Sequence, residues 1–321
     1  MGAGNIASRH LTDLMGFDDV VVCAVADPII ERARSLADRC GATAYEDHAR
    51  MVEAERLDSL YICVPPFGHG APEATALTYG LPFFVEKPLA IDLVTAEAVA
   101  AEVVARGLVT AVGYHWRYLD TTERAQALLS MNPARLALGY WLDATPPPSW
   151  WSVEAGSGGQ MIEQTTHIFD LTRLLVGEVT RVYATGSRTE RSAFPGSDVL
   201  DVSTATLNFS TGAVGSISST CLLGWPHRIG LHLAADGMLL ELSEFELLVD
   251  VGRGRPLQAA QGDPFVREDR DFIDAVRGRP NRIRAPYLEA IKTHRLALAA
   301  AQSAREGRPI DLPLEKGSRG E

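Results

Sequence analysis

Lys87 follows Glu86 and the apolar run over residues 81–85, so a carboxylate and an ammonium, both candidates for catalysis, stand at the end of a predicted strand. A short continuous apolar run is typical of a strand buried on both faces, and Pro88 ends the ladder because it lacks an amide donor. The carboxyl ends of strands in an open parallel sheet form the edge where ligands bind. Because an ammonium is costly to desolvate, Lys87 indicates either a local Glu–Lys pair or a ligand site at that edge.

A second constellation comprises Glu163, His167 and Asp170, which share one side of a helix predicted over residues 159–175. A neutral imidazole accepts the proton of a hydroxyl group, and a neighbouring carboxylate orients the ring and stabilises its cationic form. The alternatives are a structural histidine held by local acids and a metal site. We expect no metal, because the chain has no second histidine cluster.

The opening residues form a G-x-G-x-x-A pattern of Gly2, Gly4 and Ala7. Such glycines permit a tight turn and close approach of backbone to a dinucleotide. Asp27 follows the apolar run over residues 20–26, about 20 residues after the glycine turn. An acid at this distance binds a ribose 2′-hydroxyl, which favours NAD over NADP. The alternative is a local capping role for the same acid.

A glycine turn of this kind follows a first strand, whereas this sequence begins at the turn. We therefore expect a strand of about six residues upstream of Met1. The intact mass of the protein from its natural source tests that expectation.

Apolar runs alternate with helical stretches up to about residue 112, which is typical of βαβ units and a parallel sheet. The predicted strands cover residues 20–26, 59–64, 82–85 and 109–113, and the predicted helices cover 29–39, 71–79 and 92–105.

After residue 118 short strands separated by tight turns indicate a mostly antiparallel sheet. The predicted strands there cover residues 135–142, 181–185, 203–209, 213–219, 229–234 and 238–242, and later helices cover 265–276 and 286–304. We predict an α/β protein with a Rossmann domain at residues 1–117, its first strand apparently missing, and an α+β domain at 118–321 for substrate binding and oligomerisation.

The composition excludes several classes of partner. A net charge of −11 with no basic block argues against nucleic acid or an anionic membrane surface. The four cysteines never form a C-x-x-C pair, which indicates reduced core residues. Without an apolar stretch of ~20 residues or a leader pattern, a cytoplasmic location is expected.

Aromatic residues precede the helix of the second constellation. Trp150 and Trp151 form a candidate lid for a sugar or cyclitol ring, because flat indole faces suit its apolar side. Tyr114 and Arg117 are further candidates, since a guanidinium binds a carboxylate or phosphate bidentately. Packing at a domain junction is an equal alternative for these residues.

These segments together resemble the glucose-fructose oxidoreductase and inositol dehydrogenase (Gfo/Idh/MocA) family of nicotinamide-dependent oxidoreductases, over nearly the whole chain. The combination of Glu86-Lys87-Pro88 with the acid-x-x-x-His pair is specific, and the matching motifs are the glycine turn, Asp27-Pro28, Val64-Pro65-Pro66 with His69, residues 113–118, the Gly158-Gly159 helix and the closing residues 272–308.

The resemblance implies NAD(H)-dependent hydride transfer to or from a secondary alcohol of a sugar, cyclitol or related polyol. It makes Lys87 a contact of substrate and nicotinamide, His167 the acid/base, and Glu163 the acid one turn before it, where members commonly carry Asp. The residues expected along the cofactor are Gly2, Gly4, Asn5, Ile6, Asp27, Val64, Pro65, His69, Glu86 and Lys87. The residues expected on the substrate side are Tyr114, Arg117, Trp150, Trp151 and Asp170.

Two other functions compete with dehydrogenation. NAD-dependent glycoside cleavage through transient oxidation uses the same chemistry, and a non-catalytic dinucleotide-binding regulator predicts degraded site residues, whereas Lys87 and His167 are both present. A sheet face without helices needs a cover, which indicates assembly through the C-terminal sheet, and the resemblance implies a homodimer or homotetramer.

Overall fold

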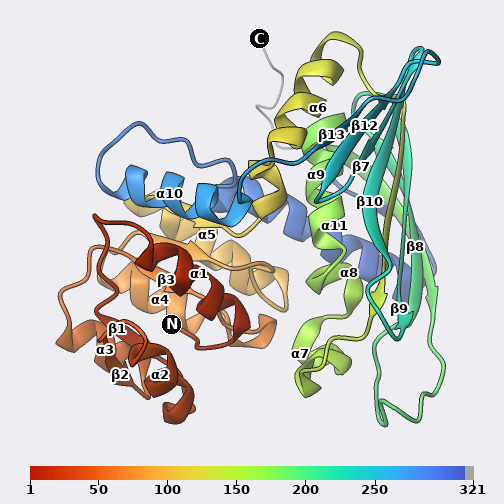
Figure 1. The fold of residues 1–321 in the computed structure, drawn as a ribbon. Helices are drawn as coiled ribbons and strands as arrows, with labels where there is room; N and C mark the ends of the chain where they lie inside the picture. Colours follow the sequence, from red (N-terminus) through yellow and green to blue (C-terminus); the bar gives the residue numbers. More distant parts are fainter. Residues whose placement is uncertain (315–321) are drawn as a thin grey trace. The chain divides into compact units, whose positions relative to one another are not determined.

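The computed structural model describes residues 1–314, which divide into two units (Figure 1). Unit 1 contains Met1–Tyr118 and Asp263–Ile291, and unit 2 contains Leu119–Gly262 and the described residues from Lys292 onward. The return of residues 263–291 to unit 1 carries no local sequence signal. The predicted boundary at residues 117 and 118 stays a prediction.

Unit 1 is built from short parallel strands and the helices that connect them. Its elements are α1 (Asn5–Met15), β1 (Ala24–Ala26), α2 (Ile30–Ala37), β2 (Thr43–Tyr45), α3 (His48–Ala54), β3 (Leu60–Ile62), η1 (Pro66–Gly68), α4 (Ala71–Thr78), β4 (Phe83–Val85), α5 (Leu93–Arg106), β5 (Thr110–Val112), η2 (His115–Tyr118) and α10 (Pro264–Val276). β1 pairs with β2, and β4 lies between β3 and β5 in a second parallel sheet. All three β4 side chains are fully buried, which explains the continuous apolar run.

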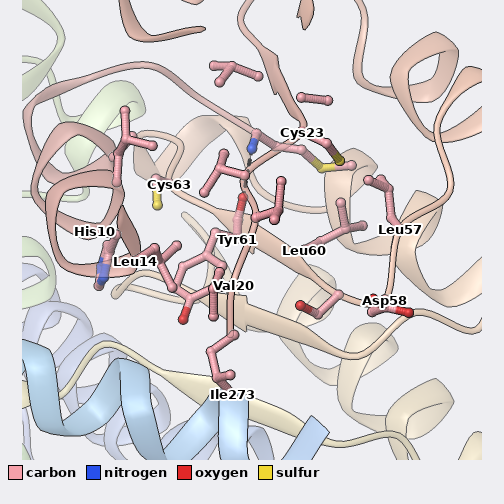
Figure 2. Close-up of a pocket in the computed structure, with 18 of the residues that line it drawn as sticks. His10, Leu14, Val20, Cys23, Leu57, Asp58, Leu60, Tyr61, Cys63 and Ile273 are labelled. Atoms are coloured by element: carbon pink, nitrogen blue, oxygen red, sulfur yellow. Dashed lines mark hydrogen bonds between the residues drawn. The ribbon is translucent and has the colours of Figure 1, made fainter. Parts of the chain in front are cut away.

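A cavity of about 220 Å³ lies between the two small sheets of unit 1 (Figure 2). Its walls include residues 20–25 on the β1 side and residues 57–61 on the β3 side, with Leu11 and Leu14 of α1. Within residues 1–314, no strand pairs with β1 or β3 on this side, so β1 is shorter than the predicted strand over 20–26. The strand expected upstream of Met1 stays a prediction.

Unit 2 is built on a nine-stranded sheet. Its strands are β6 (Leu136–Ala144), β7 (Val179–Ser187), β8 (Val202–Phe209), β9 (Val214–Leu223), β10 (Arg228–Ala235), β11 (Met238–Leu242), β12 (Glu246–Asp250), β13 (Leu257–Ala259) and β14 (Ile310–Asp311). Their order is β13-β12-β11-β10-β6-β9-β8-β7-β14, and within this sheet, as far as the described residues go, only the β6–β9 pairing is parallel. The predicted fold class, Rossmann-like parallel sheets followed by a mostly antiparallel sheet, is confirmed.

Helices pack on one face of this sheet (Figure 1). They are α6 (Asp120–Met131), α8 (Gln160–Glu163), α9 (Thr166–Val176) and, towards the chain end, α11 (Tyr287–Glu306), while η3 (Ser149–Ser152) and α7 (Glu154–Ser157) precede α8. β8 alternates buried side chains such as Ala205 and Leu207 with exposed ones such as Thr204 and Thr206. A search of residues 1–314 finds no helix with the length and hydropathy of a membrane span.

Candidate active site in two halves

The glycine turn lies at the carboxyl ends of β1 and β3 in unit 1. The Gly2 amide donates to the Ala26 carbonyl at 2.8 Å. The Met1 ammonium donates to the Tyr61 carbonyl of β3 at 2.7 Å, and the Met1 carbonyl accepts from the amide of Cys63, just past β3, at 2.8 Å. Gly2 has a φ of 84°, and a Cβ there lies 2.2 Å from Cys63 O. Only glycine fits this position without moving backbone.

Gly4 precedes α1, and a Cβ added to it meets nothing within 4 Å. No side chain caps α1 at Gly4, so the amides of its first turn remain directed at the open space before the helix. Asn5 is exposed and Ile6 half-buried in this turn. A helix start with free amides and no side chain in the way fits the pyrophosphate of a dinucleotide.

Asp27 follows β1 at the same edge. Its carboxylate accepts hydrogen bonds from the backbone amides of Ala3 and Ile29, each at 2.8 Å. The Asp27 carboxylate therefore closes the turn over residues 27–29 and ties the glycine turn to the end of β1. It does not cap α2, whose N-cap is Ile29. Its predicted bond to a ribose stays a prediction.

His69 follows the half-buried Val64 and Pro65, at the end of η1 beyond β3. Its Nδ1 lies 2.6 Å from Glu73 Oε1, and Glu73 also accepts from the Gly70 amide at 2.6 Å. The buried Nε2 has no hydrogen-bond partner among residues 1–314. A buried ring fixed through one nitrogen and unsatisfied at the other fits a ligand that brings a hydrogen-bonding group.

Lys87 stands where the sequence predicts it, directly after the fully buried β4. It is half-buried, and the Lys87–Pro88 peptide bond is cis. The Glu86 carboxylate folds back into unit 1, because its Oε2 accepts from the Lys87 amide at 3.1 Å and its Oε1 lies 3.0 Å from His10 Nε2. The predicted contact of Glu86 with the cofactor stays a prediction.

In unit 2, the single helix predicted over residues 159–175 is wrong. One turn, α8, ends at Glu163, and α9 begins at Thr166. At the break the Thr165 amide donates to the Gln160 carbonyl, five residues back, at 2.8 Å, and the Gln160 Nε2 donates to Gln164 Oε1 at 3.0 Å and to the Thr220 carbonyl of β9 at 2.9 Å. Glu163 and His167 thus lie on successive helices rather than on one helical face.

The two groups are nevertheless held by rigid aromatic neighbours. The ring of His167, which is 4% exposed, stacks on Trp141 of β6 with centroids 5.7 Å apart and planes 19° from parallel. Trp151 donates its indole N–H to Glu163 Oε2 at 2.6 Å. Unit 2 therefore presents an oriented imidazole and an oriented carboxylate.

Two of the residues predicted on the substrate side of unit 2 are buried instead. Trp151 is 1% exposed in a cluster with Val199 and Cys221, and Trp150 is half-buried against the cluster, so the predicted lid stays a prediction. Asp170 is 1% exposed and accepts from the Thr293 hydroxyl of α11 at 2.8 Å. The burial of Trp151 fits packing, the alternative weighed for it from the sequence, and the predicted substrate contact of Asp170 stays a prediction.

Tyr114 and Arg117 lie inside unit 1. Tyr114 is 1% exposed and Arg117 3%. The Arg117 guanidinium donates to the Arg284 carbonyl at 2.9 Å and lies 3.4 Å from Glu289 Oε1. These bonds give Arg117 a structural role, and its contact with a substrate stays a prediction.

A buried group that the sequence analysis missed lies behind Lys87. His10, Glu86 and Glu268 each direct one potential ligand atom to a common place, with these atoms within 4.8 Å of one another. The residues are 76 to 258 positions apart, so no spacing pattern reveals them.

Comparison with known proteins identifies the family. Residues 1–114 match the model of the oxidoreductase family with an NAD-binding Rossmann fold (GFO_IDH_MocA), and residues 134–236 match the GFO/IDH/MocA C-terminal domain. The chain belongs to the GFO/IDH/MocA oxidoreductase family. The predicted resemblance and the prediction of a nicotinamide-dependent oxidoreductase are thereby confirmed.

Relatives of this family member align over most of their length. Myo-inositol 2-dehydrogenase of Thermotoga maritima is 25% identical over 99% of this chain and 90% of its own. The scyllo-inositol 2-dehydrogenase (NAD(+)) of Bacillus subtilis is 24% identical over 100% of this chain and 97% of its own. The crystal structure of the WlbA dehydrogenase from Bordetella pertussis, in complex with NADH and UDP-GlcNAcA, superposes with a TM-score of 0.85 at 20% identity, over 98% of each chain, which shows the fold.

Proposed function

We propose that this family member is an NAD-dependent dehydrogenase that oxidises a secondary alcohol of a sugar, cyclitol or related polyol, reversibly. The observation that carries the proposal is the edge of unit 1 where Asp27, His69 and Lys87 follow the carboxyl ends of β1, β3 and β4, with the glycine turn bonded to the ends of β1 and β3. The curated relatives named as inositol dehydrogenases support this class of substrate.

The cofactor site is proposed from unit 1 alone. Gly2, Gly4, Asn5 and Ile6 form the turn and first helical amides for the pyrophosphate. Asp27 is the proposed ribose ligand and makes NAD the preferred cofactor over NADP. Val64, Pro65 and His69 follow β3 at the same edge. When bound, nicotinamide supplies the acceptor or donor of the hydride.

Lys87 and His167 are the proposed groups for the alcohol. His167 Nε2 or Nδ1 takes the hydroxyl proton during oxidation and returns it during reduction. The Lys87 ammonium stabilises negative charge on the same oxygen, and preorganised electrostatic stabilisation of this kind is usually the largest catalytic term. Glu163, fixed by Trp151, is proposed to orient the acid/base pair for the substrate.

The experiment is a panel of polyols, cyclitols and sugars assayed by NADH absorbance, followed by Lys87→Met and His167→Ala on the best substrate. We expect kcat to fall roughly 100- to 1,000-fold in each variant, as for loss of one oxyanion donor, while the Kd of NAD is retained. The matched control is Arg106→Met, which removes an exposed cation at the end of α5 that pairs with Glu102. Wild-type turnover in Lys87→Met or His167→Ala rejects the assignment.

The same assays separate dehydrogenation from glycoside cleavage. A dehydrogenase accumulates NADH in proportion to the alcohol consumed. Release of an aglycone without net NADH formation contradicts the proposal and supports the alternative.

We also propose a homodimer or homotetramer through the sheet face of unit 2 that lacks helices. Tyr183, Thr206, Ser216 and Leu138 lie in one register row across β7, β8, β9 and β6. Tyr183 is 44% exposed and Leu138 42%, and exposed large hydrophobic side chains on the uncovered face of a sheet favour its burial in an interface. Leu138→Lys should lower the oligomeric mass in light scattering, and an unchanged mass contradicts the interface.

A further inference from the structure

His10 lies in α1, inside unit 1, between two carboxylates. Its Nε2 is 3.0 Å from Glu86 Oε1, and its Nδ1 is 2.8 Å from Asp269 Oδ1. The residue is 1% exposed. A neutral imidazole donates through only one nitrogen, so two carboxylate partners require the doubly protonated ring or a proton on one carboxyl group.

The charges around the ring favour the imidazolium. Burial alone lowers the pKa of His10, but the charge of Asp269 and the hydrogen bonds to Asp269 and Glu86 raise it well above its usual value. Burial alone raises the pKa of Glu86, but the hydrogen bond from His10 and the charges of His10 and Lys87 lower it. The 3.0 Å contact and both pKa directions therefore favour a buried ion pair of His10 and Glu86.

Glu268 of α10 completes the cluster as a neutral acid. It is fully buried, and neither carboxyl oxygen has a hydrogen-bond partner within residues 1–314. Burial, and then the charge of Glu86, raise its pKa well above the usual range. An uncharged Glu268 leaves His10 as the cation that neutralises Glu86.

The Glu86 carboxylate connects this cluster to Lys87. One oxygen receives the His10 bond and the other accepts from the Lys87 backbone amide at 3.1 Å. Gly113 leaves room for this arrangement, because a Cβ there lies 2.4 Å from Glu86 Oε1. The side chain of Glu86 therefore clamps the backbone that carries the Lys87 ammonium.

We propose that His10 is a positioning residue for Lys87, which acts through the Glu86 carboxylate and touches neither substrate nor cofactor. The proposal rests on the function proposed above for Lys87. It differs from a purely structural role because loss of His10 disturbs the reaction only while the Lys87 ammonium is present. A purely structural role affects stability and turnover whatever residue stands at position 87.

A metal ion is the competing occupant of the cluster. His10 Nε2, Glu86 and Glu268 supply donors that divalent ions bind, and Asp269 is placed to hold the other ring nitrogen. A bound ion, however, needs a deprotonated Nε2, whereas the Glu86 contact and the raised pKa of His10 favour the protonated ring.

The test is a double-mutant cycle with His10→Asn, Lys87→Met and the double variant, measured as kcat and KM at saturating NAD. We expect His10→Asn to lower kcat roughly 10- to 100-fold, the range for a misplaced reacting group, and to leave the Kd of NAD unchanged. In the Lys87→Met background the same substitution should have no further effect on kcat. An equal fold-loss in both backgrounds overturns the proposal, whereas full activity of Lys87→Met itself overturns the proposed function instead.

Gly113→Ala provides a second variant that leaves His10 in place. Its Cβ displaces the Glu86 carboxylate, and the expected loss of kcat again disappears in the Lys87→Met background. The matched control is Gly224→Ala, whose Cβ meets nothing within 4 Å. Unchanged kcat in Gly113→Ala overturns the clamp. Elemental analysis that finds one divalent ion per chain, lost in Glu268→Gln, also overturns the proposal.

Discussion

Glu268 makes the stability of unit 1 depend on pH in a way that one substitution removes. The carboxyl group is fully buried, without a hydrogen-bond partner in the described chain, and near the charged Glu86. Burial raises its pKa well above 4.5, so above that pH the folded protein keeps a proton that the unfolded chain releases. Glu268→Gln replaces this acid with a neutral group of the same shape.

The sign and size follow from proton linkage. A carboxyl group with a raised folded pKa contributes its full stability below the unfolded value of 4.5, and that contribution falls as pH rises towards the folded pKa. In this window one proton changes the free energy of unfolding by about 1.4 kcal/mol per pH unit. The gap between Glu268→Gln and wild type should therefore widen in favour of the variant, by up to about 2.7 kcal/mol between pH 5.5 and 7.5.

Urea unfolding at several pH values measures this gap. His10 and Asp269 also titrate abnormally, but both are present in the two proteins, so their effects largely cancel in the difference. Glu102→Gln, an exposed acid paired with Arg106, is the matched control and should follow wild type. Parallel curves for wild type and Glu268→Gln would refute the assignment of a buried neutral acid, as would the absence of a variant-sensitive protonated carboxyl band in infrared spectra.

The glycine turn and the Glu163 contact give the remaining predictions. Gly2→Ala should lower the free energy of unfolding by more than about 1 kcal/mol. The φ of 84° at Gly2 and the Cys63 carbonyl oxygen, 2.2 Å from an added Cβ, leave no room for a side chain. An unchanged denaturant midpoint contradicts this prediction. Gly4→Ala should keep the midpoint but raise the Kd of NAD measured by calorimetry, since its Cβ points into open space; wild-type affinity contradicts the pyrophosphate site. Trp151→Phe removes the 2.6 Å bond to Glu163 and should lower kcat by roughly tenfold, as loss of a bond to a charged group does; a change in KM alone contradicts it.

Local patterns predicted the strands whose burial is complete. The run over residues 82–85 needed no alternation because β4 has neighbours on both sides, and the structure assigns Phe83–Val85. The run over residues 20–26 reads just as strongly, yet only Ala24–Ala26 pair. Apolar side chains are a property of the sequence, whereas a ladder needs a partner strand, and residues 20–23 face the cavity.

Helical spacing placed Glu163 and His167 on one helix, whereas the structure places them on two, α8 and α9. The Gln160 side chain at the start of α8 bonds to Thr220 of β9, a contact that no spacing pattern reveals. Burial of Trp151 depends on the same long-range packing. Sequence spacing describes neighbours along one helix, whereas the contacts that position α8 include a residue 60 positions away.

His10 was beyond sequence reasoning because its partners are Glu86 and Asp269, 76 and 259 residues away. Because His10 lies in α1, one helix serves two parts of the proposed site. The helix begins at the glycine turn proposed for the pyrophosphate, and its buried face carries the imidazole that holds Glu86. One rigid element of 11 residues thus connects the cofactor end of unit 1 with the clamp on Lys87. Because a helix moves as a rigid body, displacement of α1 moves both the glycine turn and the contact of His10 with Glu86. We infer that the spacing between Gly4 and His10 sets the position of these two groups relative to each other.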